Sequence, residues 1–353
     1  MGRKKKEDIE VVEQEQSQEV KTKKKANILD TNMMSADFIM DEDQIIIPVS
    51  PLLDIGLNGG IPEGVIVSIS GKPKCGKSSL CLHFCANAQQ PEYGSKKIFY
   101  FDIERRLAKK NLQSIKHLDI PNVNVIRSEK GSILDASSFL NTSNKIINEN
   151  PGCVIVLDST SALASNDELT SEIGEQTRPE VPRLLAKWTR QVAQVIGIQK
   201  CIIILIQHVM DKQSYGGGIT EDGGQKVQYH GDVKIRCKYT EKWTPSNADK
   251  PIGQICHWDI LWGALGAPSP ADGYIRFGEG IDVPTELIMA GTDLGLISKG
   301  GAWFTCDYLN GIVENNTSYK FQGQEKLRNF LTDNPEHVNT LSKQIREMMA
   351  YDK

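Results

Sequence analysis

A long apolar segment is missing from this sequence, and its absence limits the kinds of protein that the chain can be. The longest apolar run extends only from Cys201 to Ile206, whereas a membrane-spanning helix needs about 20 apolar residues. The basic start, Met-Gly-Arg-Lys-Lys-Lys, is followed by no apolar stretch, so we expect no secretory signal. We therefore expect a cytoplasmic protein without a membrane partner.

Cysteine pairs at metal-binding spacing are also missing. The eight cysteines include no CxxC pair, and no second pair of ligands accompanies Cys81 and Cys85. Cysteines of this kind indicate reduced thiols in a reducing compartment, and we expect no zinc site.

An excess of charge of either sign is missing as well. Charged residues make up 24% of the chain, and the formal net charge is −4. This balance argues against DNA binding over the whole surface in the manner of a histone, although it allows a local basic groove. The hydrophobic share of 39% is that of an ordinary folded protein.

The beginning of the chain has a composition of its own. Residues 1 to about 26 are rich in Lys, Glu and Gln and contain almost no aromatic residues, which is typical of disorder. This tail is either a solvated segment or a tether that contacts DNA or a partner. We assign residues 1–44 to a disordered charged tail that also offers a segment for contact between subunits.

From Ile45 onward the pattern is one of alternating strands and helices. Short β-branched runs predict parallel strands that are covered on both faces. Amphipathic stretches at Ser78–Ala88 and Val181–Ile196 predict helices between them. The sequence therefore predicts an α/β core with right-handed crossovers. The β-branched runs lie at residues 65–70, 97–103, 153–159 and 201–207.

After Ile219 the pattern changes to consecutive strands joined by polar turns, which predicts antiparallel pairing at residues 234–240, 254–262 and 274–281. From about residue 284 the patterns are helical and end in His337–Tyr351. We therefore predict a small C-terminal α/β domain after the core. The domain boundaries that follow are 1–44, 45–283 and 284–353.

One segment has the pattern of a phosphate-binding loop. Gly71-Lys72-Pro73-Lys74-Cys75-Gly76-Lys77-Ser78 follows an apolar strand and opens a helix, which is the context that this motif requires. Its glycines let backbone N–H groups wrap the phosphates, and the helix N-terminus adds its dipole. Lys77 can reach the outer phosphates, and the Ser78 hydroxyl can bind Mg²⁺. The loop predicts a site for ATP or GTP, bound by Gly71, Lys72, Pro73, Lys74, Cys75, Gly76, Lys77, Ser78 and Ser79.

Polar side chains end three other predicted strands. Asp158 ends the strand at 153–159, where a magnesium-associated carboxylate is expected. Glu104 lies just past the strand at 97–103, where a carboxylate can orient or deprotonate an attacking water. Asp102 would share a face with Glu104 in an extended strand, so either could be the base. Gln207 ends the last of these strands and is either a sensor of the γ-phosphate or an ordinary strand-end residue.

These features, in their order along the chain, resemble the RecA recombinase family over about Val49 to Met349. The resemblance implies a RecA-like P-loop ATPase core with a mixed, largely parallel central sheet, followed by a small C-terminal domain. It implies ATP and Mg²⁺ as cofactors, with Glu104, Lys77 and Gln207 as catalytic residues and Ser78 and Asp158 at the metal. The matching stretches are Ser50–Gly64, Val156–Leu163, Tyr274–Ile281, Lys299–Phe304 and Phe330–Glu336.

The resemblance also implies two loops that hold DNA, at about 166–182 and 208–225. The second of these is glycine-rich and follows Gln207 directly, and it shows no strand or helix pattern. Such a loop can order its N–H groups and lysines against a phosphate backbone and stack a tyrosine on a base. The DNA-binding residues implied are Arg178, Lys212, Tyr215, Gly216, Gly217, Gly218, Gly223, Gly224 and Lys226.

Several family positions are changed in this chain. The residues expected beside the adenine are Ala108 and Asn111 in place of an acid and an aromatic residue. Between Asp259 and Ala267 there is none of the lysines that in bacterial members reach the neighbour's ATP. Either another cation substitutes, or the activity is weak or differently coupled; the candidate cations are Arg105, Arg106 and Lys250. These departures suggest a phage or atypical recombinase similar in role to UvsX, acting in the host cytoplasm.

The function that the resemblance implies is a DNA-dependent ATPase for recombination and repair. It would form open helical filaments of its own copies on single-stranded DNA and exchange strands with a homologous duplex. Single-strand-binding and loader proteins would be further partners. The alternatives are a RecA-core ring motor of the helicase kind, a small-molecule kinase, or a filament-forming mediator with weak ATPase activity.

Overall fold

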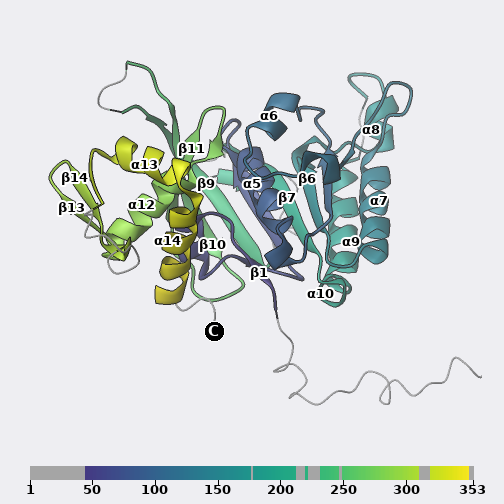
Figure 1. Ribbon diagram of the computed structural model, residues 1–353. Coiled ribbons are helices and arrows are strands. Elements are labelled where there is room, and N and C mark those ends of the chain that lie inside the picture. Colours follow the sequence, from purple (N-terminus) through teal and green to yellow (C-terminus); the bar gives the residue numbers. More distant parts are fainter. Residues whose placement is uncertain are drawn as a thin grey trace, which may run out of the picture. The chain divides into compact units, whose positions relative to one another are not determined.

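A computed structural model describes residues 44–175, 178–211, 219–221, 231–245, 249–309 and 319–349 (Figure 1). Residues 1–43 of the predicted tail therefore lie outside the described residues. The described chain from Ile45 onward belongs to one compact unit. Within this part of the chain, no helix combines the length and the apolar character that crossing a membrane requires.

A large mixed sheet organises the fold (Figure 1). Its strands follow one another in the order β12-β11-β10-β9-β3-β7-β6-β4-β5. The pairs from β9 to β5 are parallel, and those from β9 to β12 are antiparallel. The predicted parallel core and its antiparallel extension are thus confirmed. The strands are β3 (Ile66–Gly71), β4 (Ile98–Asp102), β5 (Val123–Ile126), β6 (Val154–Asp158), β7 (Ile202–Asp211), β9 (Val233–Trp243), β10 (Gly253–Trp262), β11 (Ala271–Arg276) and β12 (Gly280–Ile281).

Helices cover both faces of the parallel part, because successive side chains of a strand point to opposite faces. In β6, Val154 and Val156 belong to the hydrophobic cluster that includes α5 (Lys77–Ala88). Ile155 and Leu157 belong to the cluster on the other face. The helices of that face are α7 (Ala136–Glu149), α9 (Val181–Ala193) and α10 (Ile196–Gln199). Burial on both faces explains why these strands are continuous apolar runs.

Short elements complete the core. Strands β1 (Ile46–Ile47) and β2 (Ile61–Pro62) form a small antiparallel sheet around α4 (Pro51–Leu57). Helix α6 (Lys109–Gln113) follows β4, and α8 (Asn166–Thr170) follows β6.

The two predicted DNA loops contain more regular structure than the sequence indicated. Strand β7 continues through Asp211 and pairs with β8 (Ile219–Glu221), which joins Val209 to Glu221 and Asp211 to Ile219. The prediction that residues 208–225 lack strands is therefore wrong for residues 208–211 and 219–221. Cross-strand pairing supplies backbone hydrogen bonds that the glycine-rich composition does not reveal. In the first loop, Ser165 caps the short helix α8.

The C-terminal part has its own hydrophobic cluster, which includes Leu287, Phe304, Leu327 and Leu341. Its three strands form a separate antiparallel sheet. The predicted helix at His337–Tyr351 is present, but it begins two residues earlier, at Pro335 (Figure 1). The elements are α12 (Val283–Asp293), β13 (Ile297–Gly300), β14 (Trp303–Cys306), β15 (Lys320–Gln322), α13 (Gln324–Asp333) and α14 (Pro335–Met348).

A network of ion pairs connects the last sheet strands to these C-terminal helices. Arg276 at the end of β11 pairs with Asp282 at 2.6 Å and with Glu325 of α13 at 3.1 Å. Arg328 of α13 pairs with the same Asp282 at 3.2 Å and with Glu279 at 2.6 Å. Arg276, Asp282 and Arg328 are buried. Because a buried charge that loses its partner is strongly destabilising, these residues depend on one another.

Candidate active site

The phosphate loop connects the end of β3 to the start of α5. Lys74 and Gly76 have positive φ angles of 64° and 93°, which turn the chain so that the helix begins at Lys77. Gly76 is required for a second reason. A Cβ atom at this position would lie 2.3 Å from Cδ1 of Ile275, which packs against the loop from β11. The loop is therefore shaped by its own backbone and by the antiparallel extension beside it.

Replacing Gly76 with alanine is expected to destabilise the protein more than a positive φ angle alone would. An L-residue in this conformation costs about 1–2 kcal/mol, and the contact with Ile275 adds the cost of overpacking, about 1–3 kcal/mol. Gly295 is a matched control, because its φ angle is 76° and a Cβ atom added there would meet no other atom within 4 Å. Thermal unfolding of Gly76→Ala and Gly295→Ala measures the difference. Equal losses of stability would contradict the packing argument.

Lys77 lies inside the loop, only 5% exposed. Its ammonium group donates hydrogen bonds to the carbonyl oxygens of Gly71 at 2.8 Å and Lys72 at 2.9 Å. These bonds hold a buried positive charge at the place where the loop would receive the outer phosphates. The phosphate-binding role of Lys77 stays a prediction.

Asp158, at the end of β6, faces the start of α5. The Ser78 hydroxyl donates to its Oδ2 atom at 2.7 Å, and the Tyr100 hydroxyl donates to the same oxygen. Burial raises the pKa of the Asp158 carboxyl, against the lowering effect of these two hydrogen bonds. A hydroxyl and a carboxylate form an oxygen-only set that suits Mg²⁺. Among the described residues no group of three or more His, Cys, Asp and Glu side chains could hold a metal ion.

Glu104 is held by three donors from different elements. Its Oε1 atom accepts from the Ser159 hydroxyl at 2.7 Å and lies 3.1 Å from Nε2 of His208. Its Oε2 atom pairs with Arg106 at 2.8 Å. Burial acts to raise the pKa of Glu104, but the hydrogen bonds from Ser159 and His208 and the Arg106 charge outweigh it and keep the pKa below its usual value. The carboxylate is therefore ionised and can accept a proton.

Asp102, the alternative base, has a different environment. Strand β4 ends at Asp102, and a turn with Arg105 at a φ of 54° follows. The expectation that Asp102 and Glu104 share one face of an extended strand is therefore wrong. The Asp102 carboxylate is 2% exposed and accepts hydrogen bonds from the backbone N–H groups of Arg106 and Leu107. It stabilises the turn that presents Glu104, although it also borders the cavity.

Gln207 lies beneath the phosphate loop. It pairs in register with Ser70 of β3, is 1% exposed, and accepts a hydrogen bond from the Ser68 hydroxyl at 2.7 Å. The next residue, His208, borders the cavity in its place. His208 and Ser159 were missed as site residues by sequence reasoning. Their positions directly after Gln207 and Asp158, two residues already singled out, are the signal that could have found them.

A cavity of about 350 Å³ brings the predicted site residues together. The loop forms one wall, and the carboxylates of Glu104 and Asp158 form another. The antiparallel extension closes the cavity with Gln254, Ile275 and Phe277. The residues of the predicted site that line it are Pro73, Lys74, Cys75, Gly76, Lys77, Ser78, Ser79, Glu104 and Asp158.

The remaining predicted site residues are placed as follows. Arg178 is exposed just before α9. Lys212, Tyr215, Gly216, Gly217, Gly218, Gly223, Gly224 and Lys226 lie outside the described residues, so their DNA contacts remain predictions.

The structure also describes the residues at which this chain departs from the family pattern and the cations that could substitute for the missing lysines. Asn111 accepts a hydrogen bond from the backbone of Ala108 and so stabilises the start of α6. Of the candidate cations, Arg106 pairs with Glu104 of its own chain and Arg105 pairs with Glu129 at 3.5 Å. Lys250 is exposed.

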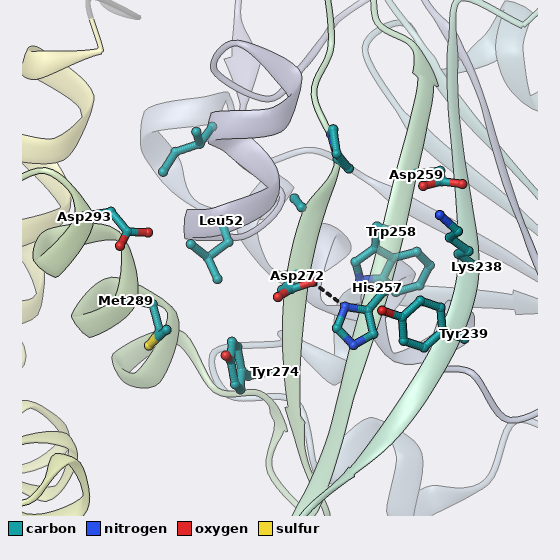
Figure 2. Close-up of a pocket in the computed structure, with 13 residues that line it drawn as sticks. Leu52, Lys238, Tyr239, His257, Trp258, Asp259, Asp272, Tyr274, Met289 and Asp293 are labelled. Carbon is teal, nitrogen blue, oxygen red and sulfur yellow. Dashed lines mark hydrogen bonds and ion pairs between the residues drawn. The ribbon is translucent and has the colours of Figure 1, made fainter.

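A second pocket, of about 430 Å³, lies between the antiparallel extension and helices α4 and α12. Figure 2 shows His257 and Asp272 pointing toward one another from neighbouring strands, with Nδ1 and Oδ1 2.6 Å apart. Tyr239 stacks on His257, with 4.1 Å between the ring centroids. Among the described residues, Asp259, Asp272 and Asp293 line this pocket with a single lysine, Lys238, which makes this lining unsuited to phosphates. None of the predicted site residues that the structure describes borders it.

Comparison with known proteins gives a consistent result. A family model of the RecA N-terminal domain matches residues 32–282, and a model of the RecA C-terminal domain matches residues 285–350. Protein RecA of Streptomyces rimosus is 28% identical over 313 residues, which are 87% of this chain and 77% of the relative. Protein RecA of Aquifex aeolicus is 28% identical over 307 residues, 85% and 83% of the two chains. Protein RecA of Methylobacterium is 26% identical over 302 residues, 84% and 78%.

Proposed function

The chain belongs to the RecA family, and we propose that it hydrolyses ATP in a DNA-dependent manner while forming filaments that pair and exchange homologous strands. The resemblance inferred from its motifs is thereby confirmed. The observation that carries the proposal is the convergence of Lys77, Ser78, Asp158 and Glu104 on one cavity. Lys77 and Ser78 follow the phosphate loop, Asp158 ends β6 and Glu104 lies in the turn after β4. Together they supply a phosphate-binding lysine, metal-binding oxygens and a carboxylate for the water, which phosphoryl transfer uses.

The residues divide the chemistry among them. The loop N–H groups and Lys77 would bind the phosphates, and Ser78 and Asp158 would hold Mg²⁺ together with them. The bound ion would neutralise charge on the phosphate oxygens. Glu104 would orient a water molecule and take its proton as the water oxygen bonds to the γ-phosphorus and the bond to the β-phosphate oxygen breaks. Gln207 would couple the state of the nucleotide to the strand that leads to the second DNA loop.

The partners follow from this activity. We propose that copies of the chain assemble head to tail into an open filament on single-stranded DNA, with a homologous duplex as the second DNA partner. Single-strand-binding and loader proteins are further proposed partners, and the cytoplasm is the proposed location. The domain limits 45–283 and 284–353 and the DNA-contacting role of residues 208–225 belong to the same proposal.

One observation favours a second candidate, a filament-forming mediator with weak ATPase activity. No lysine lies between Asp259 and Ala267. Trp262 of this segment instead donates a hydrogen bond to the Gly231 carbonyl at 2.8 Å, and Lys234 lies 5.0 Å from its ring centroid. A cation from the neighbouring subunit stabilises charge in the transition state. A chain that lacks this cation is therefore expected to hydrolyse ATP slowly.

An ATPase assay with and without single-stranded DNA separates these functions. We expect stimulation of about tenfold or more, within the ordinary range of coupling between two sites. Electron microscopy with a non-hydrolysable ATP analogue should show open filaments. DNA-bound filaments without stimulated turnover would support the mediator. Closed rings would support a ring motor. If DNA did not change the rate of ATP hydrolysis and no filaments formed, the proposal would be contradicted.

A further inference from the structure

His208 occupies a fixed place between the phosphate loop and the catalytic carboxylate. In the parallel pair of β3 and β7 it lies in register with Gly71, the first residue of the loop. Its backbone N–H donates to the Ser161 hydroxyl at 3.0 Å. Two neighbouring elements therefore hold the His208 backbone, and the direction of its side chain is set by the strand.

The imidazole ring uses one nitrogen for Glu104. Nε2 lies 3.1 Å from Oε1, whereas Nδ1 is buried and has no hydrogen-bond partner among the described residues. An ionised carboxylate can only accept, so the proton of a neutral ring belongs on Nε2. The histidine is thus a donor that is aimed at a single atom of the catalytic site.

The two oxygens of Glu104 have unequal surroundings. Oε1 has two donors, His208 and Ser159, and Ser159 is completely buried. Among the described residues, Oε2 has Arg106 as its one partner, and the Arg106 side chain is 79% exposed. An exposed ion pair contributes little and is readily displaced. Oε1 is therefore the held oxygen, and Oε2 is the one that a water molecule in the cavity can reach once Arg106 moves aside.

We propose that His208 is a positioning residue for ATP hydrolysis, which together with Ser159 holds Oε1 of Glu104 so that Oε2 accepts the proton of the attacking water. This inference rests on the proposed function, because it assumes that Glu104 is the base. No other group has to change its charge in the step. The proton passes from water to Oε2, and His208 keeps its own proton on Nε2.

Variants of His208 test the role through hydrolysis and nucleotide affinity. His208→Leu removes the donor, and His208→Asn keeps an amide that is too short to reach Oε1. Both should lower kcat by about tenfold or more, the usual effect of losing a residue that orients a catalytic ligand, while KM for ATP changes less than about twofold. His208→Gln can place an amide donor near the position of Nε2 and should restore most of kcat. Unchanged kcat in both folded His208→Leu and His208→Asn, or a His208→Gln as slow as they are, would overturn the proposal.

A double variant separates failure of this inference from failure of the proposed function. In a Glu104→Gln background, His208→Leu should cause no further loss of kcat, because both changes remove the same step. An additive loss would show that His208 acts elsewhere. Normal hydrolysis by Glu104→Gln alone would refute the base itself. If Glu104→Gln hydrolysed ATP slowly while His208→Leu kept the normal kcat, only the positioning role of His208 would be refuted.

Discussion

Glu104→Gln is expected to slow ATP hydrolysis by about 10²-fold or more while nucleotide and DNA binding persist. The amide has nearly the shape of the carboxylate, so it can still meet Ser159, but it cannot take a proton from water. The carboxylate is ionised in the folded protein because its pKa lies below the usual value. Single-turnover hydrolysis and binding of a fluorescent nucleotide analogue measure the two properties separately.

The control for this variant is Glu129→Gln. Glu129 is an exposed carboxylate that pairs with Arg105 and Arg127, and it does not border the cavity. Its replacement should leave kcat within about twofold, as for surface substitutions generally. If Glu104→Gln hydrolysed ATP at the normal rate, the base would have to be Asp102 or another group.

Lys77→Ala is expected to abolish turnover and nucleotide-driven filament extension. Loss of a single group that stabilises charge in the transition state usually lowers kcat by about 10²–10³-fold, and here the ground-state phosphate contact is lost as well. Lys77 is buried, so Lys77→Met, which keeps most of the aliphatic volume, should be equally inactive. Steady-state ATPase rates and electron microscopy of filaments with nucleotide check both effects.

Lys110→Ala is the matched control outside the loop. Lys110 of α6 is exposed and does not border the cavity, so its side chain can be shortened without touching the phosphate site. This variant should retain turnover. Full activity of both Lys77 variants would refute the phosphate site, and comparable inactivation of Lys110→Ala would show that loss of any lysine charge, and not of Lys77 in particular, stops turnover.

The parts of the fold that the sequence predicted well are those where one physical demand acts on consecutive residues. Val154 to Leu157 are buried on both faces of the sheet, and such burial leaves a continuous apolar run that can be read directly. The phosphate loop could also be recognised in the sequence, because it needs two glycines, Gly71 and Gly76, at a fixed spacing. The antiparallel extension followed from the changed pattern after Ile219, whereas the order of the strands in the sheet was not predicted.

Features that arise from neighbours in space were harder to predict. His208 meets Glu104 across 104 positions of sequence, and Ser159 meets it across 55. The local sequence pattern does not indicate that these segments lie side by side in the fold. Asp102 was paired with Glu104 because an extended strand was assumed, whereas the strand stops and turns between them. The β7–β8 pairing was hidden by a glycine-rich composition that also suits loops.

The ion network at the end of β11 makes the parts of the protein respond unequally to salt. Contacts between exposed cations and DNA phosphates weaken steeply as ionic strength rises, whereas charge pairs shielded from water are screened much less. Arg276, Asp282 and Arg328 are of the shielded kind, and Ile275 beside them packs on Gly76. The proposed contacts with DNA are therefore expected to weaken with added salt well before this buried network does. A protein that has released DNA in concentrated salt is expected to remain folded and to bind DNA again on dilution.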